Sequence, residues 1–294
     1  METQKITVEF VREALPPRRA DGHKGDFGKV LIAGGAVGYT GAPYLAALGA
    51  ARSGCGLVYL GVPSCIWTVT AAKCVCAMPF PLPEEGGMLA ERAAAPLLER
   101  LAGCEVLALG PGLGRSAQTQ ALTLALLKTE KPVVLDADGI NALAGHLDVL
   151  DGRKAPTVLT PHEGEFARLT GCGLPVRERV EAAQRFAAAH RCTMVLKGYG
   201  TVTAAPDGRV WVNPTGNPGM AKGGSGDVLA GMTAALWGQK LLRREENDLP
   251  RLAAAAVYYH GLAGDLCARR LGEYAMLPGD MIEALPEVLK GQED

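Results

Sequence analysis

Short apolar runs alternate with longer helical patterns along most of this chain, and this alternation constrains the fold more than any other feature. The apolar runs lie at residues 29–33, 56–61, 105–109, 132–135, 157–160 and 193–196. The helical patterns lie at residues 42–53, 91–101, 117–128, 163–169 and 177–189, and a further helix is expected to begin near residue 140. Strands that are buried on both faces are continuously apolar, and helices commonly connect parallel strands. The alternation therefore predicts an α/β fold with a mostly parallel sheet covered by helices on both faces.

The last third of the chain departs from this alternation. Residues 201–204 and 209–212 flank Pro206-Asp207-Gly208, which predicts an antiparallel hairpin. Helical patterns follow at residues 225–237, 250–270 and 278–289. Residues 1–23 form a lead-in with a short amphipathic piece, and no linker or repeat divides the rest. We therefore expect residues 1–294 to form a single domain.

The composition excludes several classes of function. The formal net charge is −1, and Lys and Arg are spread along the chain without the basic stripe of a nucleic-acid-binding protein. No apolar run reaches the roughly 20 residues that a transmembrane helix needs, and the N-terminal segment is polar rather than signal-like. The 8 cysteines include no Cys-x-x-Cys pair that would indicate a metal site. We expect a soluble, cytoplasmic protein with small-molecule ligands and with neither nucleic-acid nor membrane partners.

Polar and glycine-rich segments follow the predicted strands. They are Gly34-Gly35, Gly110-Pro111-Gly112-Leu113-Gly114, Asp136-Ala137-Asp138, Thr160-Pro161-His162-Glu163 and Lys197-Gly198-Tyr199-Gly200-Thr201. In an open parallel sheet, ligands bind beyond the carboxyl ends of the strands, so these segments predict one large binding crevice. Neither glycine-rich segment matches the Gly-x-Gly-x-x-Gly dinucleotide fingerprint, and the chain has no P-loop motif. A NAD-dependent dehydrogenase or a P-loop NTPase would therefore lack its signature here.

A glycine-rich loop runs directly into a predicted helix at Gly223-Gly224-Ser225-Gly226-Asp227. Glycine lets backbone N–H groups approach a ligand closely. The first N–H groups of a helix have no internal partner and carry partial positive charge, so this junction is suited to hold an anion such as a phosphate. We interpret Asp227 as a general base or acid beside that phosphate site.

Each of these polar residues also has a purely structural interpretation. Asp136 and Asp138 could cap the helix that follows them, because Asp is favoured at helix N-termini. His162 could be a turn residue, and Lys197 could be a solvated lysine at a strand end. Asp227 could be a charge that complements the helix dipole. The density of glycines around Asp227 favours the functional interpretation of that residue.

Six further motifs point to one family. They are residues 25–35, Tyr39-Thr40-Gly41-Ala42-Pro43, residues 110–114, Leu135-Asp136-Ala137-Asp138-Gly139-Ile140-Asn141, residues 159–166 and Lys197-Gly198. Their content and order resemble the ADP-dependent NAD(P)H-hydrate dehydratase family over roughly residues 20–285. The segment at residues 223–227 resembles the Gly-x-Gly-Asp signature of the ribokinase-like superfamily, to which that family belongs. The resemblance implies a single-domain, ribokinase-like three-layer αβα sandwich with a mostly parallel central sheet.

The resemblance implies a repair reaction on damaged nicotinamide cofactors. Hydration of the reduced ring of NADH or NADPH gives the dead-end hydrates NADHX and NADPHX. A member of the family is a lyase that removes water from the S-epimer and restores NADH or NADPH, while ADP is converted to AMP and phosphate. Mg²⁺ is also expected, because phosphoryl transfer needs charge neutralisation. No dedicated carboxylate cage for this ion is evident in the sequence.

The family motifs also imply roles for individual positions. Asp227 is expected to act as the acid–base group at the substrate hydroxyl, and Gly224, Ser225 and Gly226 are expected to stabilise the transferring phosphoryl group. The hydrated nicotinamide nucleotide is expected to contact Ala42, Gly114, His162 and Asp227. The nucleotide, ADP or AMP, is expected to contact Lys197, Gly198, Tyr199, Gly200, Thr201 and Gly226. No metal ligand is assigned.

Two further expectations concern partners. Many family members carry an epimerase domain that interconverts the R and S hydrates, and the roughly 20 residues before the match are too few for one. We therefore expect a separate NAD(P)HX epimerase, and we expect this chain to form a homo-oligomer such as a tetramer. Two alternatives remain open. A small-molecule kinase of the same superfamily would share the fold and the base, and a non-catalytic nucleotide sensor would bind nucleotide without turnover.

Overall fold

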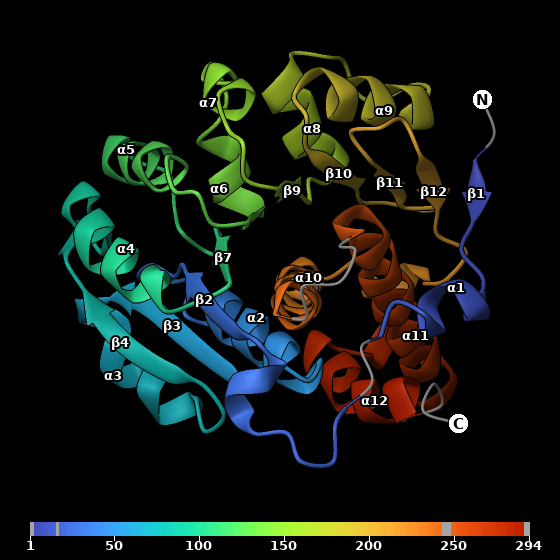
Figure 1. The fold of residues 1–294 in the computed structure, drawn as a ribbon, viewed down its shortest axis with the longest axis horizontal. Coiled ribbons are helices and arrows are strands. Elements are labelled where there is room, and N and C mark those ends of the chain that lie inside the picture. Colours follow the sequence, from blue (N-terminus) through green and yellow to red (C-terminus); the bar gives the residue numbers. More distant parts are fainter. Residues whose placement is uncertain (1–2, 16–17, 243–247, 291–294) are drawn as a thin grey trace.

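A ten-stranded sheet forms the centre of the molecule, with helices on both of its faces (Figure 1). The computed structural model describes residues 3–15, 18–242 and 248–290. The strand order is β1-β12-β11-β10-β9-β8-β7-β2-β3-β4. The strands are Gln4–Lys5 (β1), Lys29–Ala33 (β2), Leu57–Pro63 (β3), Met78–Leu82 (β4), Val106–Leu109 (β7), Val133–Leu135 (β8), Thr157–Leu159 (β9), Thr193–Leu196 (β10), Val202–Ala204 (β11) and Val210–Val212 (β12).

The sheet is parallel except where β11 takes part. β2 pairs in parallel with β3 and β7, and β8, β9 and β10 continue in the same direction. β11 runs antiparallel to β10 and to β12. The predicted mostly parallel sheet and the predicted hairpin are therefore confirmed. Because parallel strands share one direction, the segments that follow β2, β7, β8, β9 and β10 all leave the same edge of the sheet.

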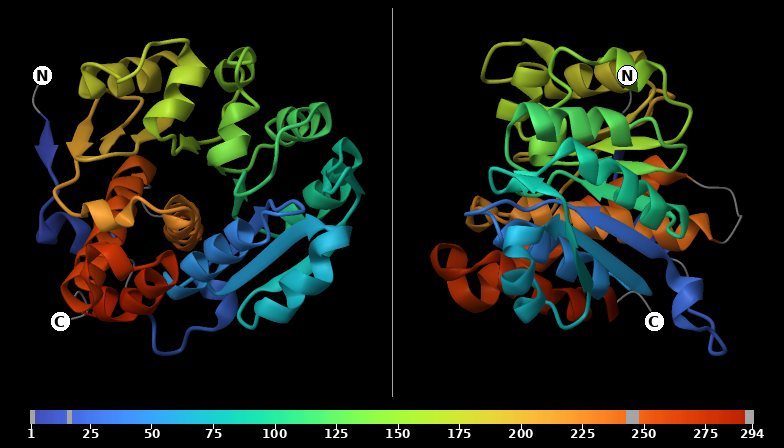
Figure 2. Two further views of the ribbon diagram at one scale, coloured as in Figure 1. Left: turned by 180° about the vertical axis from the view of Figure 1, so that it is seen from behind. Right: turned by 90° about the vertical axis from the view of Figure 1, so that its left-hand side faces the viewer.

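The helices divide between the two faces, as Figures 1 and 2 show. α2, α10, α11 and α12 cover one face, while α4, α5, α8 and α9 cover the other. The helices are Val8–Arg12 (α1), Gly41–Arg52 (α2), Ser64–Lys73 (α3), Ala94–Ala102 (α4), Ala117–Leu126 (α5), Ala137–Asn141 (α6), Asp148–Asp151 (α7), Glu163–Thr170 (α8), Arg179–Ala189 (α9), Ser225–Leu241 (α10), Leu249–Ala275 (α11) and Pro278–Lys290 (α12). The predicted α/β class with helices on both faces is confirmed.

Alternating residues of the central strands point into two separate cores. In β2, Val30 and Ile32 belong to the core beneath α2 and α10. Leu31 and Ala33 belong to the core on the other face, with α4, α5, α8 and α9. All four side chains are completely buried. This two-sided burial explains why the strand is a continuous apolar run rather than an alternating one.

α10 approaches α2 closely enough to require glycine at the crossing. A Cβ atom at Gly231 would lie 1.9 Å from the carbonyl oxygen of Ala46, and one at Gly49 would lie 2.7 Å from the carbonyl oxygen of Val228. Both distances are far below van der Waals contact. The two glycines therefore allow α10 to lie beneath the middle of the sheet, which places its N-terminus at the carboxyl ends of the strands.

Several elements were not anticipated from the sequence. α3 and β4 follow β3 directly, and β5 (Glu84–Glu85) pairs with β6 (Met88–Leu89) in a small second sheet. β4 is an edge strand that contains Pro79 and Pro81, and proline in a run argues against a central strand. The lead-in at residues 1–23 contains β1 and α1, with residues 1–2 and 16–17 outside the described part. None of the described helices has the length and apolar character that crossing a membrane requires.

Candidate active site

The glycine-rich loop enters α10 through a residue with a left-handed backbone. Gly224 is the N-cap residue of α10 and has φ = +108°. A Cβ atom there would lie 2.6 Å from Leu45 Cδ1, so both the conformation and the space favour glycine. Ser225, Gly226 and Asp227 form the first turn, as the sequence predicts. The N–H groups of this turn are the ones that a 17-residue helix leaves without helical partners.

His260 braces this first turn from α11. Its Nε2 atom lies 2.8 Å from the carbonyl oxygen of Ser225. A carbonyl can only accept a hydrogen bond, so Nε2 carries the proton and donates it. Burial lowers the pKa of His260 to about 4, which keeps the ring neutral near pH 7. His260 therefore ties the start of α10 to α11 without adding a charge.

Asp227 is a partly buried carboxylate with an altered proton affinity. Within the described part of the chain, the Asp227 side chain makes no hydrogen bond. Burial raises its pKa to about 7, and the nearby Asp136 carboxylate adds to the rise, whereas Lys197 opposes it. A pKa near the working pH suits a group that both accepts and releases a proton. The environment of Asp227 is therefore the one that general acid–base catalysis needs.

Lys197 reaches from the end of β10 to the start of α10. Its Nζ atom lies 2.9 Å from Asp136 Oδ1, and a Cβ atom at Gly226 would lie 2.9 Å from the same nitrogen. Burial favours the neutral amine, but Asp136, Glu165 and Asp227 outweigh this effect and raise the pKa of Lys197. The interpretation of Lys197 as a solvated lysine is therefore wrong. An ammonium group stands beside the predicted phosphate site.

Asp136 and Asp138 do not cap the helix that follows them. Asp136 occupies the N-cap position of α6, yet its side chain makes no capping hydrogen bond. Its Oδ1 atom instead accepts hydrogen bonds from Lys197 and from the Thr160 hydroxyl, at 2.9 and 2.7 Å. Asp138 accepts hydrogen bonds from the Gly114 N–H, the Arg115 guanidinium and the Asn141 amide. The helix-cap interpretation is therefore wrong for both side chains.

His162 has a structural role that the structure shows directly. It is the N-cap residue of α8, and its Nδ1 atom accepts hydrogen bonds from the N–H groups of Gly164 and Glu165. Glu165 in turn accepts a hydrogen bond from the His162 N–H at 2.8 Å. Burial lowers the pKa of His162, which agrees with a neutral ring. His162 also pairs with Lys197 across the sheet edge, so it lies close to the candidate site.

The segment that follows Lys197 forms an exposed turn. Gly198 and Gly200 have φ values of +151° and +60°. The Thr201 hydroxyl donates a hydrogen bond to the Gly198 carbonyl at 2.9 Å. The Tyr199 side chain is fully exposed, at 100%. Of the predicted nucleotide contacts, Lys197 and Gly226 therefore lie at the buried end and Tyr199 lies at the solvent end.

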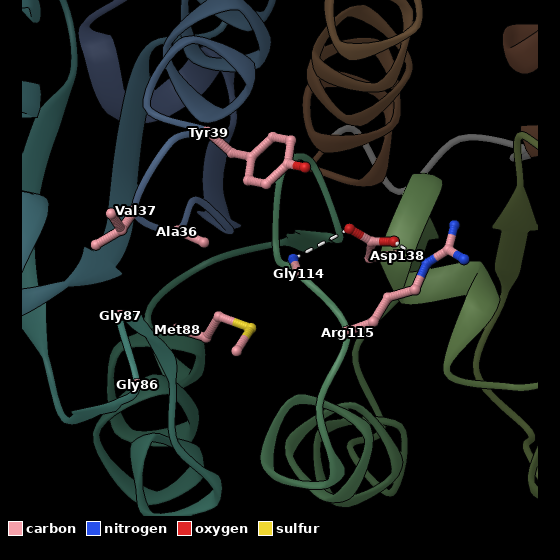
Figure 3. Close-up of a pocket in the computed structure, with 9 residues that line it drawn as sticks. All are labelled: Ala36, Val37, Tyr39, Gly86, Gly87, Met88, Gly114, Arg115 and Asp138. Carbon is pink, nitrogen blue, oxygen red and sulfur yellow. Dashed lines mark hydrogen bonds and ion pairs between the residues drawn. The ribbon is translucent and has the colours of Figure 1, made fainter.

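A cavity of about 550 Å³ lies beside Gly114, as Figure 3 shows. It is bounded by the residues after β2, by the β5–β6 turn and by the residues after β7 and β8; they are Ala36, Val37, Tyr39, Gly86, Gly87, Met88, Gly114, Arg115 and Asp138. Arg115 is the cation among these lining residues, and its side chain is 59% exposed. The Arg115 side chain lies at the edge of the cavity, where its Nε atom donates a hydrogen bond to Asp138 at 2.8 Å.

Ala42 lies close to the loop that carries Gly114. A Cβ atom at Gly112 would lie 3.0 Å from the Ala42 Cβ atom and 2.9 Å from the Tyr39 carbonyl oxygen. The structure thus brings the predicted substrate contacts Ala42 and Gly114 to one side of the sheet edge. A second group of predicted site residues lies after β9 and β10. His162 follows β9 and pairs with Lys197, which follows β10, and Lys197 in turn acts on Asp227.

The sequence interpretation missed several residues of this site. The sequence places Asp136, Asp138 and Thr160 only in segments of the predicted crevice, without individual roles, and it assigns no site role to Glu165, Arg115 or His260. The Asp-x-Asp pattern at a strand end was the available signal for the first two residues. His260 lies within a long helix and meets Ser225 only because α11 crosses the start of α10. No local sequence pattern indicates that contact.

Known proteins share this fold and these motifs. A family model described as NAD(P)H-hydrate dehydratase matches residues 30–287. The bifunctional NAD(P)H-hydrate repair enzyme of Moorella thermoacetica is 47% identical over 294 residues, which covers 98% of this chain. This chain covers 54% of that enzyme, and it spans about half the length of the bifunctional relatives that it matches.

Two Bacillus subtilis comparisons cover nearly complete chains. The ADP-dependent (S)-NAD(P)H-hydrate dehydratase of Bacillus subtilis is 37% identical over 292 residues, and the match covers 97% of each chain. A crystal structure of the Bacillus subtilis ADP/ATP-dependent NAD(P)H-hydrate dehydratase, co-crystallised with ATP and Mg²⁺, superimposes with a TM-score of 0.81. That match has 34% identity and covers 100% of both chains. The present chain therefore belongs to the NAD(P)H-hydrate dehydratase family.

Proposed function

We propose that this protein removes water from the S-epimer of hydrated NADH or NADPH and restores the reduced cofactor, while ADP is converted to AMP and phosphate. The observation that carries the proposal is the partly buried Asp227 carboxylate in the first turn of α10, with the Lys197 ammonium beside it. A base, a cation and a set of helix N–H groups are the parts that transfer of a phosphoryl group to a hydroxyl needs.

The chemical problem in this reaction is the leaving group. Hydroxide leaves a ring carbon poorly, whereas phosphate leaves readily. Asp227 takes the proton of the substrate hydroxyl, and the freed oxygen attacks the terminal phosphorus of ADP, so that AMP departs. The electron pair of the ring nitrogen then expels phosphate from the ring carbon. Loss of a proton from the neighbouring ring carbon completes the reduced nicotinamide ring.

Residues around Asp227 would bind the phosphoryl group, the rest of the nucleotide and the hydrate. The N–H groups of Gly224, Ser225 and Gly226 would hold the oxygens of the transferring phosphoryl group, and Lys197 would offset its negative charge. The exposed turn at residues 198–201 would hold the rest of the nucleotide. The hydrate would lie toward Ala42, Gly114 and His162, with its phosphates near Arg115 at the mouth of the cavity.

Mg²⁺ would arrive with the nucleotide rather than occupy a resident site. Within the part of the chain that the structure describes, no group of three or more His, Cys, Asp and Glu side chains could hold a metal ion. Mg²⁺ in phosphoryl-transfer sites is commonly held by substrate phosphates and few protein ligands. The donor set therefore does not fit a protein-bound ion, and no step is assigned to one.

The location and the assembly of the enzyme are part of the same proposal. Residues 1–294 act as one catalytic unit in the cytoplasm, as a homo-oligomer such as a tetramer. An NAD(P)HX epimerase converts the R hydrate into the S hydrate that this enzyme accepts.

An oxygen-tracing experiment tests the proposed route. The hydrate is labelled with ¹⁸O in its ring hydroxyl and is incubated with the enzyme and ADP. Because the hydroxyl oxygen attacks phosphorus, the label is expected in the released phosphate, with one AMP formed for each NADH. Label found only in water would overturn phosphorylation of the hydroxyl. A stable phosphorylated alcohol without NADH would instead indicate a small-molecule kinase.

A further inference from the structure

The Asp136 side chain makes contacts that its place in the chain does not require. It is 2% exposed and lies at the N-cap position of α6 without capping that helix. Its Oδ1 atom accepts hydrogen bonds from Lys197 Nζ and from Thr160 Oγ1. A buried carboxylate is costly unless it is paired and hydrogen-bonded, so these two contacts account for its stability in this position.

The backbone around Asp136 is arranged to hold this side chain in place. The next residue, Ala137, has φ = +47°, a left-handed conformation that is unfavourable for residues other than glycine. Gly110 lies so close that a Cβ atom would be 1.9 Å from the Asp136 carbonyl oxygen. The Asp136 N–H donates a hydrogen bond to the Leu109 carbonyl. Strain of this kind persists where the surrounding structure fixes a conformation, and it clusters at functional sites.

The partner of Asp136 lies at the point where the proposed chemistry occurs. Lys197 Nζ is 2.9 Å from the position that a Cβ atom of Gly226 would take, so the ammonium lies against the first turn of α10. The same Gly226 position is 4.0 Å from Asp136 Oδ2. A lysine side chain has four rotatable bonds, and without an anchor its ammonium would sample many positions. Asp136 supplies that anchor.

We propose that Asp136 is a positioning residue, which holds the Lys197 ammonium at the N-terminus of α10 beside the phosphoryl group that is transferred. This inference rests on the proposed function and adds to it a residue that acts through Lys197. Asp136 does not touch the substrate in this account. Its negative charge also affects Asp227, because both carboxylates face the same lysine.

Four charged side chains face Asp227 and affect its pKa. They are Asp136 after β8, Asp138 on α6, Glu165 on α8 and Lys197 after β10. Asp136 raises the pKa of Asp227, and Lys197 lowers it. Removal of the Asp136 charge should therefore lower the pKa of Asp227, and removal of the Lys197 charge should raise it. These shifts report the charges around Asp227, whereas the dependence of the Asp136 effect on Lys197 reports positioning.

The test uses Asp136→Asn, Lys197→Met and the double variant in the full-length protein, with Thr160→Val as a matched control. Thr160→Val removes one hydrogen bond to Asp136 and keeps every charge. Asp136→Asn is expected to lower kcat by roughly 10- to 100-fold at high pH, where Asp227 is ionised in all variants. In the Lys197→Met background, the same substitution should cost less than about threefold, because the group through which it acts is gone.

A second measurement is independent of turnover. The Asp227 carboxylate is titrated by ¹³C NMR in each variant, and circular dichroism confirms that each variant is folded. The expected result is a lower Asp227 pKa in Asp136→Asn, a higher one in Lys197→Met and a smaller shift than either in Thr160→Val, which keeps both charges. Equal losses of kcat in both backgrounds, or an unchanged Asp227 pKa in Asp136→Asn, would overturn the proposal. An inactive wild-type enzyme with the expected NMR shifts would overturn the proposed function and leave this arrangement of charges supported.

Discussion

Asp227→Asn is expected to make the folded protein more stable while it abolishes activity. The carboxylate is partly buried, and within the described structure its side chain makes no hydrogen bond, so its charge lowers the stability of the folded state. Its pKa is raised from 3.8 to about 7, mainly by burial and then by Asp136. Asparagine has nearly the same shape and carries no charge, so the variant removes this cost without creating a cavity.

The magnitude follows from the two proton affinities. Each tenfold change in proton affinity corresponds to about 1.4 kcal/mol, so a rise of this size corresponds to about 4 kcal/mol. The folded state binds the proton more tightly than the unfolded state does. The stability of the wild type should therefore fall as the pH rises from about 4 to about 7, and it should not fall further above that range.

Urea denaturation at a series of pH values measures this effect. At about pH 8, Asp227→Asn should have a free energy of unfolding that is up to about 4 kcal/mol higher than that of the wild type. The difference should shrink toward zero below about pH 3, where the wild-type carboxyl is protonated in the unfolded state as well as in the folded state. A variant that is less stable than the wild type at pH 8, or a difference that does not depend on pH, would refute the reasoning about Asp227.

Three further predictions concern packing and binding. Gly231→Ala should lower the free energy of unfolding, measured in urea, by about 1–3 kcal/mol, because the new Cβ atom would lie 1.9 Å from the Ala46 carbonyl oxygen. The control is Gly41→Ala, which should leave the free energy of unfolding unchanged because the space around Gly41 is open. Arg115→Ala should raise KM for the hydrate about tenfold and leave KM for ADP unchanged, and an effect on ADP instead would contradict the placement of the hydrate by the cavity. Gly198→Ala should raise KM for ADP about tenfold in steady-state assays, because its φ of +151° is strained for alanine; unchanged ADP kinetics would argue against nucleotide binding at that turn.

The strands could be predicted from the sequence where both of their faces are buried. Val30 and Leu31 enter opposite cores, so the apolar run that contains them is continuous and easy to recognise. β4 could not be recognised in the same way, because Pro79 and Pro81 interrupt it and it lies at the edge of the sheet. α3 follows β3 without a break and has only two buried residues, Ile66 and Thr70, so it lacks a clear apolar stripe.

The candidate site was predictable as a set of segments but not as a set of contacts. The rule for parallel sheets places the segments after β8 and β10 at one edge, and it does not say which side chains meet there. The pairing of Lys197 with Asp136 joins positions 61 residues apart. It depends on the order of β8, β9 and β10 in the sheet and on the strained turn at Ala137.

The most direct test of the account is the return of NADH absorbance when the purified protein is mixed with hydrated NADH. Parallel reactions contain ADP, ATP or no nucleotide, and the same set is repeated with Asp227→Asn. The account predicts a rise in absorbance that requires ADP and is absent in the variant, which circular dichroism shows to be folded. A rise with ATP alone would contradict the assigned phosphoryl donor. No rise with any nucleotide, or an equal rise with Asp227→Asn, would contradict the central claim that Asp227 drives an ADP-dependent dehydration.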